Sequence, residues 1–162
     1  MFPSMRRTRQ EISREENEAV LARGSHGILS LMQPNGYPYA LPISYVYEDG
    51  TIYMHCAKSG AKIDALNHCD KASFCVVDQD EVIPERFSTN YRSVIAFGTV
   101  SIVKDEQTRQ HAFEALAKRY SPTESEEKRN AEIASGKNHA EILALQIEKL
   151  SGKIGLYMLD AK

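Results

Sequence analysis

The sequence predicts a mainly β protein, a small closed or partly closed antiparallel barrel with a few short helices. Three observations predict it. Short β-branched and aromatic segments follow one another closely, tight-turn residues separate them, and few segments have helical periodicity. We count six to seven strands. We expect a single domain over residues 1–162, because this length can enclose one core and no linker divides the chain.

Composition argues against two classes of partner. The formal net charge is -2, so no large electrostatic term favours nucleic acid or anionic lipid. No stretch is apolar and long enough to span a bilayer, and the arginines of residues 1–10 are not followed by the apolar region of a signal peptide. We therefore expect neither a nucleic-acid nor a membrane partner, and we interpret residues 1–10 as a flexible arm.

The cysteines and histidines suggest no metal site and no disulfide framework. The chain has three cysteines without CxxC spacing, and Cys56 and Cys75 lie inside apolar runs, where a buried inert thiol is expected. The five histidines show no pairing at metal-site spacing. A reducing cytoplasm is the simplest compartment for such a chain.

A helix and three strands are predicted in the first third of the chain. Ser13 and Glu16 form a capping box, and Gly24 ends the helix that follows. Asn-Gly and Asp-Gly turns separate the strand signals that come next. The strands are expected over residues 26–32, 39–47 and 51–56. We expect them to pair consecutively, as an antiparallel meander.

The rest of the chain mixes strands with two amphipathic helices. Gly98 lies inside a long strand signal, which indicates a bulge or a barrel bend. Residues 122–139 are charged and poor in large apolar groups, so we interpret them as a surface helix or a mobile excursion. We expect helices over 60–68 and 105–120, strands over 72–77, 91–103, 141–150 and 153–159, and a loop or edge over 78–85.

The segment from His55 to Lys62 has residue types suited to a phosphate group. A strand ends, a small loop with Ser59 and Gly60 follows, and a helix opens with a lysine in its first turn. Helix N-termini present unpaired N–H groups and a positive dipole, and Lys62, with Lys58 as a second cation, can neutralise the charge. The alternative is a capped surface helix with solvated lysines, which the spacing alone favours.

Two further segments leave alternatives open. Arg92 opens the longest strand and can donate bidentately to phosphate, or pair with Glu85 or Asp78, and the pattern favours neither. Pro42 removes a ladder hydrogen bond, which is typical of an edge strand and also frees backbone groups for a flat heterocycle. The edge strand is favoured on pattern alone. A lone histidine such as His55 is more often packed than catalytic.

In this order, the segments resemble the flavin-binding pyridoxamine 5'-phosphate oxidase-related family, and most closely its 5-nitroimidazole-resistance (Nim-type) branch. The specific parts are His-x-Ala-x-x-Gly-x-Lys, which begins at His55, and Tyr-Arg-Ser-Val-x-x-x-Gly, which begins at Tyr91. The resemblance extends over Gly27–Leu31, Tyr39–Tyr47, Asp49–Ala57 with Gly60 and Lys62, and Tyr91–Gly98.

The resemblance implies an FMN-binding split β-barrel that forms a homodimer, with FMN at the subunit interface. It puts the flavin ring and ribityl chain against the strand of Pro42, and the phosphate near Lys62. It also puts Arg92 near the cofactor, and this arginine is contributed either by the same chain or by the partner chain. The implied cofactor-binding residues are Pro42, Ile43, Ser44, Tyr45, His55, Ala57, Ser59, Lys62, Arg92 and Ser93. No catalytic side chain and no metal ligand is implied.

The function that this resemblance implies is FMN-dependent reduction of a small planar acceptor, such as a nitroaromatic, by a reduced nicotinamide. His55 and Tyr45 are candidate helpers only. The alternative is a non-catalytic protein of the same fold that binds FMN or haem, with His55 or another histidine near the cleft as an iron ligand. True pyridoxamine 5'-phosphate oxidases carry Arg-x-His near the C-terminus, and here no arginine follows Arg129, so vitamin B6 oxidation is not expected.

Overall fold

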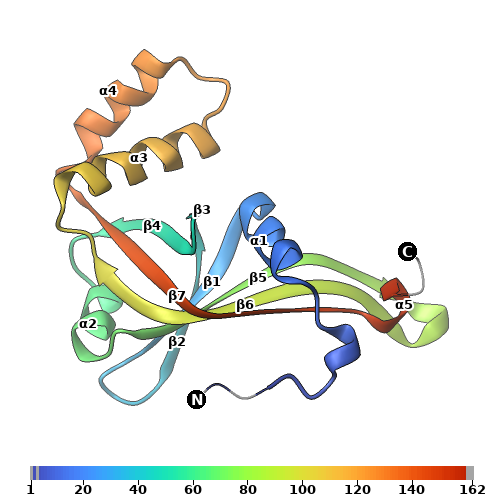
Figure 1. The fold of residues 1–162 in the computed structure, drawn as a ribbon. Helices are drawn as coiled ribbons and strands as arrows, with labels where there is room; N and C mark the ends of the chain where they lie inside the picture. The colour runs from blue at the N-terminus through green and yellow to red at the C-terminus, as the bar shows by residue number, and fades with distance from the viewer. Residues whose placement is uncertain (1, 3, 160–162) are drawn as a thin grey trace.

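The computed structural model describes residues 2 and 4–159, which form one seven-stranded antiparallel sheet with flanking helices (Figure 1). The strands are β1 (His26–Met32), β2 (Pro38–Ser44), β3 (Val46–Glu48), β4 (Thr51–Ala57), β5 (Lys71–Ile83), β6 (Ser88–Ile102) and β7 (Ala140–Ile154). The helices are η1 (Thr8–Gln10), α1 (Arg14–Arg23), α2 (Ala61–His68), η2 (Pro84–Arg86), α3 (Glu106–Tyr120), α4 (Glu126–Gly136) and α5 (Leu156–Leu159). The mainly β fold class is confirmed.

The strand order, β2-β1-β5-β6-β7-β4-β3, differs from the predicted meander. β1 pairs with β2, and β3 pairs with β4, but β4 takes β7 as its other neighbour. The chain therefore crosses from one end of the sheet to the other at Tyr45, between β2 and β3. The expected strand over 39–47 is thus two strands, because the fully buried Tyr45 turns the chain into the core.

The main core lies on the inner face of this curled sheet. The buried residues alternate along each strand, as in Leu29 and Leu31 of β1 or Ile52 and Met54 of β4. The Tyr45 and Phe74 rings meet edge to face, with centroids 4.9 Å apart. A second, smaller cluster forms where α3 packs on the outer face of the β3, β4 and β7 end, through Val46, Val103, Ala112, Leu116 and Ile142.

Gly98 lies at a shift of register between β6 and β7, so the predicted bulge is confirmed. A Cβ atom on Gly98 would lie 2.0 Å from the carbonyl oxygen of Gln146. Only glycine lets the two backbones approach this closely. The bulge therefore bends two long strands that could not otherwise follow the curvature of the barrel.

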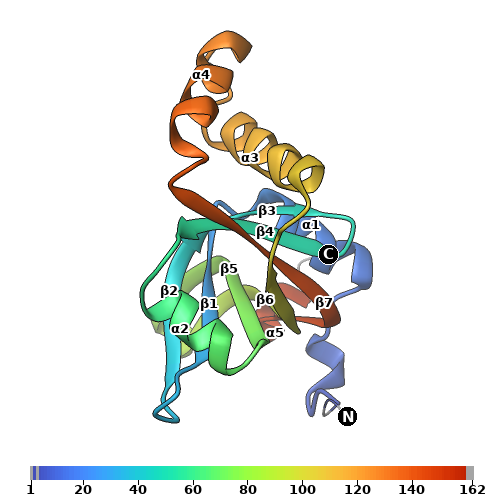
Figure 2. The ribbon, with the colours of Figure 1, turned by 90° about the vertical axis from the view of Figure 1, so that its left-hand side faces the viewer.

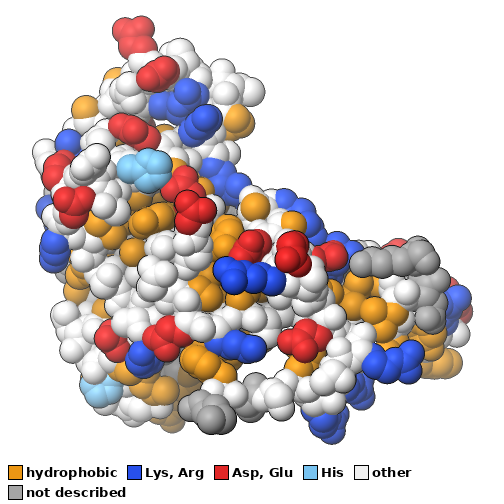
Figure 3. Space-filling view, viewed as in Figure 1, with side chains coloured by type: hydrophobic (Ala, Val, Ile, Leu, Met, Phe, Trp, Pro, Cys, Tyr) orange, Lys and Arg blue, Asp and Glu red, His pale blue; other side chains and the backbone are white. Residues whose placement is uncertain are grey.

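Residues 78–85 were expected to be a loop or an edge, and the edge alternative is confirmed: residues 79–83 extend β5 beyond its pairing with β1 and pair with β6 on one side. β5 continues to Ile83, and β6 begins at Ser88, so a long hairpin projects from the barrel (Figure 1). A register shift between Val77 and Gln79 accommodates the polar Asp78. We call this projection, residues 77–93, the β5–β6 arm. Hydrophobic side chains are gathered on its surface (Figure 3).

Two further differences concern the ends of the chain, and one alternative is confirmed in the segment between β6 and β7. Residues 141–150 and 153–159 are one strand, β7, followed by α5. The segment 122–139 contains the surface helix α4, which ends the choice between helix and mobile excursion. Within the predicted arm, Gln10 is docked: its Nε2 donates to the Ile154 carbonyl oxygen at 2.7 Å, while residues 1 and 3 are outside the described part.

No helix in the described part of the chain combines the length and the apolar character needed to cross a membrane.

Candidate functional site

A cavity of about 410 Å³ lies between the α3–α4 hairpin and the ends of β2 and β4. Figure 2 shows this hairpin standing above that end of the sheet. Two of the predicted cofactor-binding residues, Ser44 and His55, line the cavity. The other lining residues are Phe113, Leu116, Ala117 and Tyr120 of α3, Glu132, Ile133 and Gly136 of α4, and Lys137 and Ala140 after it. We call it the α3–α4 cavity.

The alternation of side chains along β2 and β4 determines which predicted residues lie on the outer face of the sheet, where the α3–α4 cavity is. On β4, His55 and Ala57 are exposed, whereas the side chains between them and before them are buried. On β2, Pro42 is exposed and Ser44 is half-buried, while Ile43 packs against the core. Ile43 can therefore offer only backbone groups to a ligand on the outer face.

Tyr45 is also oriented inward. Its hydroxyl donates to the Leu21 carbonyl oxygen at 2.7 Å, and burial raises the pKa of its phenol. Its backbone is held from the other side by Tyr120, whose hydroxyl accepts from the Tyr45 N–H at 2.8 Å and lies 2.9 Å from the Tyr45 carbonyl oxygen. The same hydroxyl reaches the Ser25 carbonyl oxygen. Tyr120 therefore fixes the chain crossing directly beside Ser44.

The N-terminus of α2 follows β4 within a few residues. Gly60 precedes it with φ 108°, a left-handed conformation that favours glycine. Its carbonyl oxygen accepts from the Ile63 and Asp64 N–H groups, and no side chain caps the helix. Ser59 is exposed beside this turn. The first N–H groups of α2 therefore keep hydrogen-bonding capacity for a ligand.

Lys62, in the first turn of α2, is half-buried and makes no ion pair with the described residues. Burial raises the pKa of the Cys56 thiol, and the positive charge of Lys62 opposes this rise, so the amine lies near the end of β4. An uncapped helix N-terminus with an unpaired amine is a suitable arrangement for a phosphate monoester.

Arg92 and Ser93 lie far from this region in the same chain. His55 is paired with Ile142, and Arg92 with Ile154, twelve residues further along β7. At the rise of a strand this is roughly 40 Å along the sheet. Arg92 instead contacts Asp78 at 3.3 Å and Glu16 at 3.4 Å. The predicted pairing with Asp78 is thus present, and one chain does not bring Arg92 and Lys62 together.

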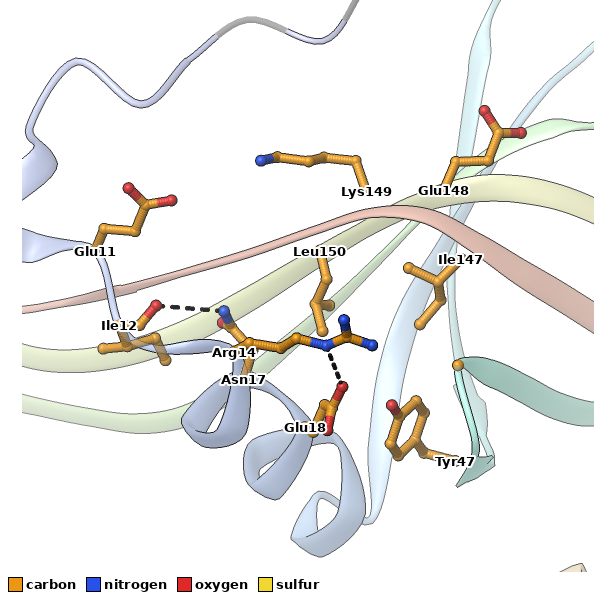
Figure 4. Close-up of a pocket in the computed structure, with 11 residues that line it drawn as sticks. Glu11, Ile12, Arg14, Asn17, Glu18, Tyr47, Ile147, Glu148, Lys149 and Leu150 are labelled. Atoms are coloured by element: carbon orange, nitrogen blue, oxygen red, sulfur yellow. Dashed lines mark hydrogen bonds and ion pairs between the residues drawn. The ribbon is translucent and has the colours of Figure 1, made fainter.

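A slightly larger cavity, about 460 Å³, lies between α1, Tyr47 and β7 (Figure 4). None of the ten predicted residues lines it. Arg14 is already paired with Glu18 at 2.8 Å, and the three lining glutamates outnumber the two cations. The local charge therefore opposes an anionic cofactor, and we assign the candidate site to the α3–α4 cavity despite its smaller size.

Sequence reasoning missed the helical walls of this cavity. Phe113 and Leu116 were recognised as an apolar face of α3, but nothing in the pattern showed that part of this face borders a cavity. The available signal was Ile133, a large apolar residue in an otherwise charged segment. Within the described residues, no group of three or more His, Cys, Asp or Glu side chains is placed to hold a metal ion.

Comparison with known proteins adds independent evidence on the family and the fold of the chain. A family model described as pyridoxamine 5'-phosphate oxidase matches residues 13–154. None of the curated proteins searched matches the chain.

Similar solved structures include a putative 5-nitroimidazole antibiotic resistance protein from Bacteroides thetaiotaomicron, with TM-score 0.73, 18% identity, and coverage of 89% of this chain and 86% of that one. A conserved hypothetical protein from Mycobacterium tuberculosis has TM-score 0.80 at 18% identity, covering 93% and 90%. A FAD and haem binding protein from Mycobacterium smegmatis has TM-score 0.74 at 25% identity, covering 91% and 74%.

Proposed function

The chain belongs to the pyridoxamine 5'-phosphate oxidase family, and from this premise we propose that it is an FMN-binding oxidoreductase that uses a reduced nicotinamide to reduce a small planar acceptor. The observation that carries the proposal is the course of β4: its His55 lines the α3–α4 cavity together with Ser44, and a few residues later the chain enters the uncapped N-terminus of α2. One structure similar to this chain, from Mycobacterium smegmatis, is of a protein named for binding FAD and haem.

The residues present suit the two ends of FMN. At the phosphate end, the Lys62 amine supplies charge, while the first N–H groups of α2 and the Ser59 hydroxyl supply hydrogen-bond donors. At the ring end, Pro42 and Ser44 present the outer face of β2. β2 is the end strand of the sheet, so its outer edge offers backbone groups to a flat heterocycle, and the Ser44 side chain offers a hydroxyl.

FMN, when bound, supplies two-electron transfer between the nicotinamide and the acceptor. The contribution of the protein is binding, orientation and exclusion of water. The apolar side chains of α3 and α4 cover part of the outer face of β4, and His55, which is exposed on that face, lines the cavity as a candidate helper. Vitamin B6 oxidation is not part of the proposal, because the chain lacks the C-terminal Arg-x-His pattern.

We also propose a homodimer and a cytoplasmic location. Large apolar side chains are exposed along the β5–β6 arm, with Val77, Val82 and Phe87 at 60%, 68% and 99%. A second copy that covers the arm would bury them and could bring Arg92 toward a cofactor that its own chain cannot reach. The three cysteines are free, in keeping with a reducing compartment.

An absorption spectrum of the purified protein, taken before and after denaturation, tests the function. The proposal predicts flavin bands and the release of FMN. A haem-binding protein is the second candidate, because His55 lines the cavity, and it predicts a Soret band instead. A colourless protein that does not bind added FMN would refute the proposed function.

A further inference from the structure

The α3–α4 hairpin has apolar side chains that line the α3–α4 cavity and are not covered by the packing of the two helices on each other. α4 packs mainly on α3, and Ile133 is its buried residue. The second half of α4 faces β4 across the cavity, with Ile133, Gly136 and Lys137 on one side and His55 on the other. Ser44 and His55 thus line the cavity on the side of the proposed flavin, and α3 and α4 supply the opposite walls.

We propose that the α3–α4 cavity is the acceptor site, and that it selects uncharged flat aromatic molecules over anionic ones. This inference rests on the proposed function. Apart from His55, Glu132 and Lys137 at its edges, most lining side chains are hydrocarbon or aromatic, such as Phe113, Leu116 and Ile133. The volume of about 410 Å³ suits a small aromatic compound.

The charges at the edge of the cavity supply the selection. The Lys137 amine is held 3.3 Å from Glu106 and 3.4 Å from Gln110, so its charge is already compensated. Glu132 lines the cavity and makes no ion pair with the described residues. An anionic acceptor would meet this uncompensated carboxylate and lose hydration, whereas a neutral ring would lose little.

Gly136 allows a clean test. It lines the cavity, its φ is not in the left-handed region, and an added Cβ would meet nothing within 4 Å. A Cβ at Gly136 therefore meets no wall of the cavity, and we expect the ring of Gly136→Phe to occupy part of the cavity. Ala134→Phe is the matched control, because it adds the same ring to an exposed position of the same helix.

The probes are 4-nitroacetophenone, which is neutral, and 4-nitrobenzoate, a similarly sized anion. Their dissociation constants from the oxidised, FMN-loaded protein are measured by equilibrium dialysis, and FMN affinity is measured separately. We expect Gly136→Phe to weaken 4-nitroacetophenone binding about tenfold or more with FMN affinity unchanged, and Ala134→Phe to change neither. We expect Glu132→Gln to strengthen 4-nitrobenzoate binding alone, several-fold.

Each outcome is decisive for the inference. Unchanged 4-nitroacetophenone binding in Gly136→Phe would overturn it, and loss of FMN in that variant would assign the cavity to the flavin instead. If Gly136→Phe does not fold, Ala117→Leu fills the same cavity from α3 and is judged by the same criteria. Failure of the wild-type protein to bind FMN would instead refute the proposed function.

Discussion

The Tyr120 hydroxyl supports the chain crossing on which the barrel depends, so its removal has a calculable cost. It accepts a hydrogen bond from the Tyr45 N–H at 2.8 Å, and its single proton is donated either to the Tyr45 carbonyl oxygen at 2.9 Å or to that of Ser25. Two hydrogen bonds therefore exist at one time. Tyr120→Phe keeps the ring and deletes both.

The expected loss is about 2 kcal/mol of unfolding free energy. Tyr45 is fully buried, so water cannot replace the acceptor of its N–H group, and a buried unsatisfied donor costs about 1–3 kcal/mol. The carbonyl oxygens contribute less, because Ser25 is exposed and can be hydrated. For a chain of this size, the same loss lowers the Tm by about 4–8 °C.

Urea unfolding followed by circular dichroism measures this loss. We expect a lower midpoint with an unchanged slope, because the surface exposed on unfolding stays the same. Tyr37→Phe is the control, since the Tyr37 side chain is 73% exposed, and it should leave the midpoint in place. A Tyr120→Phe protein within about 0.5 kcal/mol of the wild type would show that the three contacts do not hold the crossing.

Two other predictions concern the sheet. Gly98→Ala should lower the free energy of unfolding by more than about 2 kcal/mol in the same urea assay, because its Cβ would collide with the Gln146 backbone. Gly136→Ala is the control and should be neutral or slightly stabilising. Equal effects of the two substitutions would contradict the bulge. The hydrogen bond from Arg23 lowers the pKa of the Asp78 carboxyl in the folded protein. The ionised carboxylate therefore contributes its full stabilisation to the fold above the ordinary pKa of 3.8. This stabilisation is lost as the pH falls through the lowered pKa of the folded state. The stability difference between wild type and Asp78→Asn should therefore shrink in acid, and a constant difference would exclude this linkage.

Local features of the fold could be predicted from the sequence because neighbouring residues determine them. The Ser13 cap is confirmed, with its Oγ accepting from the Glu16 N–H at 3.1 Å, and so is the Gly98 bulge. Strand pairing could not be predicted in the same way. β4 pairs with β7, which comes more than eighty residues later, and no nearby residue encodes that choice.

The candidate site shows the same division. Ser44 and His55 are each predictable from strand patterns and resemblance, and the structure brings them to one cavity. The contribution of α3 and α4 depends on how a helical hairpin lies over a distant strand, which alternation and periodicity do not specify. Arg92 illustrates the opposite case, because its motif groups it with Lys62 while the sheet holds the two apart.

The central claim is that Lys62 and the N-terminus of α2 hold the phosphate of FMN. Titration of FMN and of riboflavin, which lacks the phosphate, into apoprotein carrying Lys62→Gln tests it most directly, with Lys104→Gln as an exposed control. We predict that Lys62→Gln weakens FMN binding about 10- to 100-fold and leaves riboflavin binding unchanged. Unaltered FMN affinity, or an equal loss for both ligands, would contradict the account.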